Sequence, residues 1–324
     1  MSEKEQAARA SAGIGECGKT EAGKPDMSVT IAGVTLKNPV MTASGTFGSG
    51  MEYSEFVDLN RLGAVVTKGV ANVPWEGNPT PRVAEVYGGM LNAIGLQNPG
   101  IDVFIERDLA FLTQFDTKVI VNVCGHTEEE YLEVVERLSD QSADMLEINV
   151  SCPNVRQGAI QFGQDPKCLA DITAKIKKIA RQPVIMKLTP NVTDIAEMAR
   201  AAEAGGADAV SLINTITGMK IDIEKRQFVL ANRTGGLSGP AIKPVAVRMV
   251  WQAAQAVKIP IIGMGGIASA EDAVEFMLAG ASAVAVGAMN FHDPYTTERI
   301  IDGMEEYLVR HSIGTARELT GAVR

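Results

Sequence analysis

Short apolar runs alternate with longer amphipathic segments along most of the 324-residue chain. The apolar runs are rich in β-branched residues and nearly continuous, which is typical of parallel strands that are buried on both faces. Eight runs are predicted to be strands: 38–44, 63–69, 118–125, 144–151, 183–190, 207–215, 259–266 and 282–288.

The segments between these runs are predicted to be helices. They cover 100–115, 127–140, 165–180, 194–206, 240–257, 269–281 and 293–311, with a weaker helix over 52–60. Eight alternations of strand and helix in one chain predict an α/β fold, a (β/α)8 TIM barrel. A doubly wound open sheet is the alternative for the same elements. Residues 28–39 are predicted to form a small N-terminal β-hairpin that closes the bottom of the barrel.

The chain is predicted to fold as a single domain, 27–324, because no linker rich in Pro or Ser and no change of composition divides it. Residues 1–26 are polar and charged, and we expect a flexible N-terminal arm there. The longest loops are expected after the second, fourth and sixth strands, at 69–99, 151–164 and 216–239. Long loops on one face of a barrel are where such proteins place function.

Charge and cysteine content narrow the class of protein. The net charge is −9, so nucleic acid and anionic membranes are poor candidates as partners. No apolar stretch reaches about 18 residues, and the N-terminus lacks the hydrophobic region of a signal peptide. Cys17, Cys124, Cys152 and Cys168 fit neither a metal motif nor a disulfide framework. These features predict a reducing, cytoplasmic location.

A polar residue or a glycine stands at the C-terminal end of every predicted strand. The carboxyl ends of the strands of a barrel meet at one face, so these residues should converge on one mouth. In chain order they are Ser44–Gly45, Lys68–Gly69, Asn122, Asn149 with Cys152, Lys187, Asn214–Thr215, Gly265–Gly266 and Gly287–Ala288.

The last two strands end in "GMGGI" and "VGAMN", which predict a phosphate site. Glycines expose backbone N–H groups there, and the helix after "GMGGIASAED" is expected to point its positive N-terminus at the same place. Turn glycines without a ligand are the alternative. The usual phosphate site of a barrel lies after the seventh and eighth strands, which favours the phosphate interpretation.

The first six strands end in two lysines and several amides, with no carboxylate. Such a surface suits an anionic, flat ligand with many hydrogen-bonding groups. Lys68 and Lys187 end apolar strands, and lysines that reach solvent are the alternative. His126, His292 and His311 do not have the spacing of metal ligands, so no metal site is predicted.

Cys152 lies in the stretch "NVSCPN", directly after the fourth strand. As a thiolate, a cysteine takes a proton or attacks carbon. The alternative is a small buried residue, which is what most free cysteines are. The position in a long loop at the predicted mouth favours the chemical role. For Cys124 and Cys168 the structural role is favoured.

Eight motifs in order along the chain resemble those of the dihydroorotate dehydrogenase family, from about residue 28 to the C-terminus. They are "MTASGTFGSG", "VVTKGV", "LNAIGLQNPG", "NVSCPN", "MKLTPN", "LINTITGM", "GGLSGPAIKP" and "GMGGI". The cysteine of "SCPN" resembles the soluble members, since membrane-bound relatives carry serine there. "NVRQGAIQFGQDP" and "NTITGMKIDI" resemble most the catalytic subunit of the NAD-linked type B class.

The resemblance implies FMN at the barrel mouth, with dihydroorotate lying against it. The positions that match the FMN-binding residues of the family are Ser44, Lys68, Gly69, Asn122, Asn149, Lys187, Ile213, Gly239, Gly265, Gly266, Gly287 and Ala288. The positions that match its substrate-binding residues are Lys68, Asn92, Ala93, Ile94, Gly95, Leu96, Asn149, Asn154, Asn214 and Thr215. Cys152 matches the catalytic base.

The implied reaction is the oxidation of dihydroorotate to orotate in pyrimidine biosynthesis. A hydride passes from C6 to FMN N5, and Cys152 takes the C5 proton on the opposite side of the ring. The electrons continue to NAD⁺ through an iron–sulfur/FAD subunit, which with a homodimeric core makes a heterotetramer. A fumarate- or quinone-linked enzyme, a flavoenzyme like dihydropyrimidine dehydrogenase and a phosphate-binding barrel without redox chemistry are the alternatives.

Overall fold

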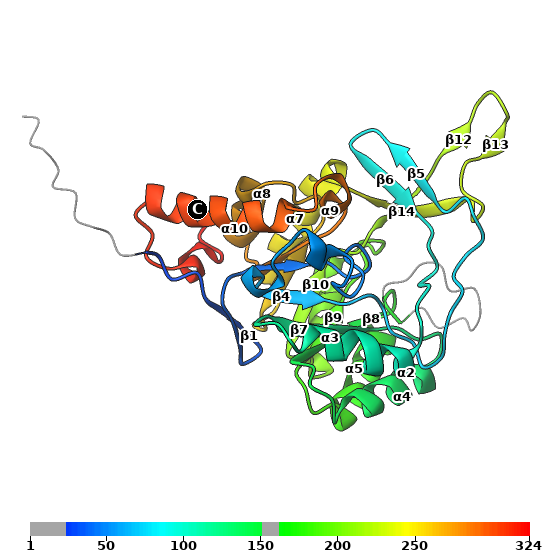
Figure 1. The fold of residues 1–324 in the computed structure, drawn as a ribbon, viewed down its shortest axis with the longest axis horizontal. Helices are drawn as coiled ribbons and strands as arrows, with labels where there is room; N and C mark the ends of the chain where they lie inside the picture. Colours follow the sequence, from blue (N-terminus) through cyan, green and yellow to red (C-terminus); the bar gives the residue numbers. More distant parts are fainter. Residues whose placement is uncertain (1–23, 151–161) are drawn as a thin grey trace, which may run out of the picture.

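Eight parallel strands form a closed barrel at the centre of the molecule (Figure 1). The computed structural model describes residues 24–150 and 162–324. The barrel strands are β3 (Val40–Thr42), β4 (Ala64–Val66), β7 (Lys118–Val123), β8 (Met145–Asn149), β9 (Val184–Lys187), β10 (Ala209–Leu212), β15 (Ile261–Met264) and β16 (Ala283–Val286). Each strand pairs with the barrel strands before and after it in the chain, and β16 pairs with β3. The predicted barrel and its eight strands are confirmed, and the open sheet is excluded.

The barrel strands are buried along almost their whole length, since one face fills the barrel and the other meets the helices. The helices are α2 (Ile101–Val103), α3 (Ala110–Leu112), α4 (Glu128–Leu138), α5 (Pro166–Ile179), α6 (Ile195–Ala204), α7 (Lys243–Ala254), α8 (Ala270–Leu278), α9 (Met289–His292) and α10 (Thr296–Arg310). In Figure 1, α2 to α5 lie on one side of the barrel, and α7, α8 and α10 lie on the other.

Two predicted helices differ in detail from the structure. The helix predicted over 100–115 forms, but its middle is a π-helical segment, η3 (Phe104–Leu109), between α2 and α3. The weaker helix predicted over 52–60 is wrong. Two 3-10 turns stand there, η1 (Tyr53–Glu55) and η2 (Leu59–Arg61). The side chain of Asp58 caps η2 by accepting from the backbone N–H of Asn60, so a new turn starts where the helix should continue. The remaining 3-10 turns are η4 (Pro240–Ile242) and η5 (Ala316–Leu319).

The N-terminal hairpin is confirmed as β1 (Val29–Ile31) and β2 (Val34–Leu36), which pair antiparallel. Its inward side chains Ile31 and Leu36 are fully buried in the main core. The folded domain also includes Asp26, which the sequence analysis assigns to the arm. The backbone N–H of Asp26 donates to Gly314 O at 2.9 Å, and Asp26 O accepts from Ala316 N at 2.9 Å.

A four-stranded antiparallel sheet stands beside the barrel (Figure 1). Its order is β11 (Ile216–Met219), β14 (Thr234–Ser238), β6 (Gly89–Asn92) and β5 (Val83–Val86). A small hairpin of β12 (Ile221–Asp222) and β13 (Gln227–Phe228) projects from it. These strands come from 69–99 and 216–239, which the sequence indicates only as long loops. The pairing of β14 with β6 joins the two loops into one structure.

Among the described residues no helix is long and apolar enough to cross a membrane.

Candidate active site

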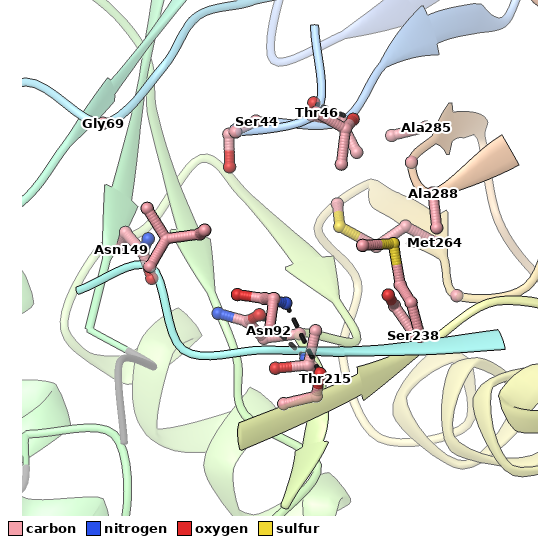
Figure 2. Close-up of a pocket in the computed structure, with 18 of the residues that line it drawn as sticks. Ser44, Thr46, Gly69, Asn92, Asn149, Thr215, Ser238, Met264, Ala285 and Ala288 are labelled. Atoms are coloured by element: carbon pink, nitrogen blue, oxygen red, sulfur yellow. Dashed lines mark hydrogen bonds between the residues drawn. The ribbon is translucent and has the colours of Figure 1, made fainter. Parts of the chain in front are cut away.

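A cavity of about 350 Å³ opens at the carboxyl ends of the barrel strands, between the barrel and the four-stranded sheet. All eight barrel strands, or the residues directly after them, contribute to its lining. Figure 2 shows Ser44 and Asn149 on the barrel side of the cavity and Asn92 and Thr215 on the side of the sheet. The prediction that the strand ends converge on one mouth is confirmed.

Most of the residues that the sequence analysis singles out line this cavity. Among those matched to FMN, they are Ser44, Lys68, Gly69, Asn122, Asn149, Lys187, Ile213, Gly239, Gly265, Gly266, Gly287 and Ala288. Among those matched to the substrate alone, they are Asn92, Ile94, Gly95, Leu96, Asn214 and Thr215. Segments that are far apart in the chain therefore meet around one space.

Three of the singled-out residues are not placed in the lining. Ala93 is fully buried and packs in a small apolar cluster with Ala84, Leu91 and Leu230. Its neighbours Asn92 and Ile94 line the cavity, because successive residues of an extended chain face opposite sides. Cys152 and Asn154 lie outside the described residues.

The lining also contains polar and apolar residues that the sequence analysis does not name: Thr46, Arg82, Met90, Gln97, Ser238, Met264 and Phe291. Arg82 is the most consequential of these. Its guanidinium donates to Gln97 Oε1 at 2.6 Å and to the backbone oxygen of Asn78 at 3.3 Å, which holds it at the cavity. The only signal for Arg82 in the sequence is its place in the long loop 69–99.

The charge of the lining is one-sided. Lys68, Arg82 and Lys187 line the cavity, and its described lining residues include no Asp or Glu. Lys187 is 4% exposed, and its ammonium donates to Ser44 Oγ at 2.9 Å. This burial contradicts the alternative that Lys187 reaches solvent. A cavity with this charge favours anionic ligands over cationic ones.

Bare backbone forms the part of the cavity near β15 and β16. Gly239 and Gly266 have φ values of +105° and +85°, a backbone region that residues other than glycine rarely adopt. A Cβ on Gly266 would lie 2.9 Å from Gly239 O, and a Cβ on Gly239 would lie 2.6 Å from the Cα of Gly89. These glycines let backbone segments pack closely together at this wall of the cavity, and the backbone N–H groups that they leave uncovered suit a phosphate group.

The N-terminus of α8, which the sequence analysis expects at the phosphate site, contributes no residue to the cavity lining. It is closed by a capping box, in which Ser269 Oγ accepts from Asp272 N and Asp272 accepts from the backbone of Ser269. Asp272 also binds Lys243 Nζ at 2.6 Å, and Glu275 binds the same amine at 2.7 Å. These two hydrogen bonds raise the pKa of Lys243. The lining stops at Gly266, before this helix begins.

A buried carboxylate lies beneath the lining, where the sequence analysis expects none. Glu147 is two residues before Asn149 on β8, so both side chains face the interior of the barrel. Its Oε1 accepts from Asn122 Nδ2 at 2.6 Å and from Lys187 Nζ at 3.4 Å. Its Oε2 accepts from Ser211 Oγ at 2.8 Å. The signal was a charged residue inside the apolar run 144–151.

The two asparagines at this end of the cavity are held in place by hydrogen bonds. Asn149 Nδ2 donates to Asn122 Oδ1 at 3.4 Å, while Asn122 uses its own amide N–H on Glu147. The hydroxyl of Tyr131 on α4 donates to the backbone oxygen of Asn149 at 2.8 Å. These contacts fix which amide atoms face a ligand.

The described part of the chain contains no group of three or more His, Cys, Asp or Glu side chains that could hold a metal ion.

Comparisons with known proteins agree with the cavity and its motifs. The family model described as dihydroorotate dehydrogenase matches residues 26–308. The chain is 70% identical over 297 residues to "Dihydroorotate dehydrogenase B (NAD(+)), catalytic subunit" of Lachnoclostridium phytofermentans, covering 92% of this chain and 99% of that one. It is 62% identical over 300 residues to the protein of the same name from Alkaliphilus metalliredigens, covering 93% and 99%.

A solved structure is similar in fold. The crystal structure of DHODH from Eimeria tenella in complex with ferulenol superposes with a TM-score of 0.78, covering 92% of this chain and 88% of that one. At 24% identity, this likeness shows the barrel fold alone.

Proposed function

The chain belongs to the dihydroorotate dehydrogenase family, and on that premise we propose that it is the catalytic subunit of an NAD-linked enzyme that oxidises dihydroorotate to orotate in pyrimidine biosynthesis. The match spans nearly the whole length of relatives that carry this name. The observation that carries the proposal is the cavity itself. Its described lining holds three cations and four asparagines with no carboxylate, which suits an anionic pyrimidine.

FMN is the cofactor that we propose for the cavity, because members of this family use a flavin. The residues fit it in two ways. Gly239, Gly266 and Gly287 present backbone without side chains at the cavity wall, which suits a phosphate, and the amides and Lys187 offer donors and acceptors to a flat polar ring. When bound, FMN supplies the oxidant that removes two electrons from dihydroorotate.

The substrate is proposed to lie on the side of the cavity that the four-stranded sheet covers. Lys68 neutralises the substrate carboxylate, and Arg82 adds a second cation at the same cavity. Asn92, Asn214 and Thr215 provide amide and hydroxyl groups for the ring edges. The sheet reduces access of water to the reacting face.

Cys152 is proposed to be the base that takes the C5 proton of dihydroorotate. It lies outside the described residues, and the role rests on its match to the family motif "SCPN" and its place three residues after Asn149. The thiolate is the form that accepts a proton, and the reference pKa of a cysteine is about 8.5. We therefore expect the rate of substrate oxidation to rise with pH through the neutral range.

The test of this proposal is rapid mixing of the FMN-loaded protein with dihydroorotate, followed by flavin absorbance. Cys152→Ser should retain FMN but slow the reduction by at least about 100-fold at neutral pH, the usual contribution of a positioned base. Cys168→Ser is the matched control, since Cys168 lies on α5 and does not line the cavity. Reduction of Cys152→Ser at the wild-type rate would remove Cys152 from the base role.

An assay with dihydrouracil distinguishes the proposed dihydroorotate dehydrogenase from an enzyme like dihydropyrimidine dehydrogenase. The two lysines and Arg82 favour a carboxylated substrate, so dihydroorotate should reduce the flavin and dihydrouracil should not. Reduction by dihydrouracil at a comparable rate would favour the alternative. A colourless protein that does not take up FMN would contradict any flavin chemistry.

The electrons are proposed to leave through a separate electron-transfer subunit, as the name of the relatives implies for a catalytic subunit. We propose that this partner carries an iron–sulfur cluster and FAD, that two catalytic subunits form the core of a heterotetramer, and that the assembly is cytoplasmic. Co-expression with the partner should give NAD⁺ reduction by dihydroorotate. Equal turnover with fumarate in the absence of a partner would favour the fumarate-linked alternative.

A further inference from the structure

Among the described residues of the barrel strands, Glu147 is a buried charged group that the proposed reaction does not use. It is 1% exposed and does not line the cavity, whereas its partners Lys187 and Asn122 do. A charged side chain is costly to bury without partners, so its presence inside the barrel calls for a role. Its hydrogen-bond partners Asn122, Lys187 and Ser211 all lie on other barrel strands.

Three hydrogen bonds hold the carboxylate of Glu147 in place. Both carboxylate oxygens only accept: Oε1 from the amide N–H of Asn122 and the ammonium of Lys187, and Oε2 from the hydroxyl of Ser211. A carboxylate that accepts from three donors is stabilised in its ionised form. The negative charge of Glu147 therefore lies 3.4 Å from the positive charge of Lys187.

We propose that Glu147 is a positioning residue that partly neutralises Lys187 and orients Asn122, and that it thereby lowers the reduction potential of the flavin bound in this cavity. The inference rests on the proposed function, because it needs FMN at the wall that Lys187 and Asn122 form. Positive charge near a flavin favours its reduced, more negative state, and a neighbouring carboxylate opposes this effect.

The direction of this effect agrees with an NAD-linked enzyme. If the positive charge of Lys187 were not partly neutralised, the flavin would be a stronger oxidant, and the electrons would remain on it. A carboxylate beneath the lysine makes the flavin a weaker oxidant, and this favours onward transfer to an acceptor of low potential. By holding the ammonium of Lys187, Glu147 also favours the hydrogen bond from Lys187 Nζ to Ser44 Oγ, which spans 2.9 Å. Ser44 follows the strand on the opposite side of the barrel from Lys187.

The experiment is a redox titration of the FMN-loaded wild-type protein and of Glu147→Gln against a reference dye. Glutamine keeps the size and removes the charge, so the equilibrium for two-electron reduction should shift at least tenfold toward the reduced flavin. That is a rise of about 30 mV. An unchanged potential would overturn the proposal, because the charge of Glu147 would then have no effect on the flavin. A lower potential would overturn it too, because the effect would have the opposite sign.

Ser211→Ala is the matched control. It removes a neutral donor from the same carboxylate and keeps the charge, so the potential should stay within a threefold change in the equilibrium or fall. A rise equal to that of Glu147→Gln would contradict the charge argument and indicate general loosening of the barrel. If Glu147→Gln does not fold, Glu147→Asp replaces it. The shorter side chain withdraws the charge from Lys187, so a smaller rise is expected and no rise overturns the proposal.

The same samples separate this inference from the proposed function. If the wild-type protein binds no FMN, or dihydroorotate does not reduce it, the proposed function fails. If dihydroorotate reduces the wild-type flavin and Glu147→Gln has the wild-type potential, only the role of Glu147 fails.

Discussion

Gly236 on β14 offers a sharp test of the part that the inserted sheet plays at the site. It lines the cavity, and its backbone oxygen accepts from Asn92 Nδ2 at 3.4 Å. A Cβ at this position would lie 1.9 Å from Thr215 Oγ1 and 2.5 Å from Thr215 Cβ. Rotation of the threonine side chain relieves the first contact but not the second, because Cβ does not move when χ1 rotates. Gly236→Ala must therefore displace the backbone of Thr215.

The size of the displacement follows from these distances. Ordinary van der Waals contact of a Cβ begins at 3.4 Å, so Thr215 Cβ must move by about 0.9 Å. A misplacement of about 1 Å in a substrate-positioning group costs roughly 100-fold in rate. We expect Gly236→Ala to lower kcat/KM for dihydroorotate by about that factor, or about 2.7 kcal/mol. FMN content is measured in the same samples, because Gly239 of the proposed phosphate site directly follows β14.

Gly218→Ala is the matched control for this variant. Gly218 lies on β11 of the same sheet, does not line the cavity and, like Gly236, has no positive φ. A Cβ there would meet Leu91 Cδ2 at 3.0 Å, which is the far end of a flexible side chain and moves easily. Steady-state kinetics with dihydroorotate compare the two variants. A kcat/KM for Gly236→Ala within threefold of wild type, or an equal loss in Gly218→Ala, would refute the reasoning.

Two further predictions concern the stability of the fold. The pKa of Asp26 lies below its usual 3.8, chiefly because of hydrogen bonds with Ser28 and also because Arg317 is 2.7 Å away. The contribution of Asp26 to stability is therefore fully present above pH 3.8, and it is lost as the pH falls through the lowered pKa. The Asp26→Asn variant should therefore unfold at a lower urea concentration than wild type near neutral pH, and the two urea midpoints should converge in strong acid. A difference in urea midpoints that does not depend on pH would contradict this prediction. Tyr131→Phe removes the hydrogen bond to Asn149 O and should cost about 1 kcal/mol. A Tm lower by roughly 1–2 °C in thermal unfolding checks this prediction, and an unchanged Tm would show that the bond contributes nothing.

The barrel and the general location of its site could be predicted from the sequence, because both depend on local patterns. Strands buried on both faces are recognisable as continuous apolar runs, and the carboxyl ends of parallel strands must meet at one face. Lys187, Asn122 and Gly266 could therefore be assigned to one mouth before any contact was known. The family motifs added the expected cofactor and substrate, which no pattern of polar residues could name.

Pairings between distant segments were decided only by the tertiary structure. The strand β6 pairs with its neighbour β5, and β14 pairs with β11, but only the pairing of β6 with β14 joins two loops more than a hundred residues apart into one sheet. The carboxylate of Glu147 is tolerated inside the barrel because Asn122, Lys187 and Ser211 reach it from three other strands. In the sequence, Glu147 is recognisable only as a charged residue within a largely apolar run. The ion pair of Asp272 on α8 with Lys243 likewise joins two different helices. A sequence records local periodicity directly, but hydrogen-bond partners and charge neutralisation depend on which segments the closed barrel brings together.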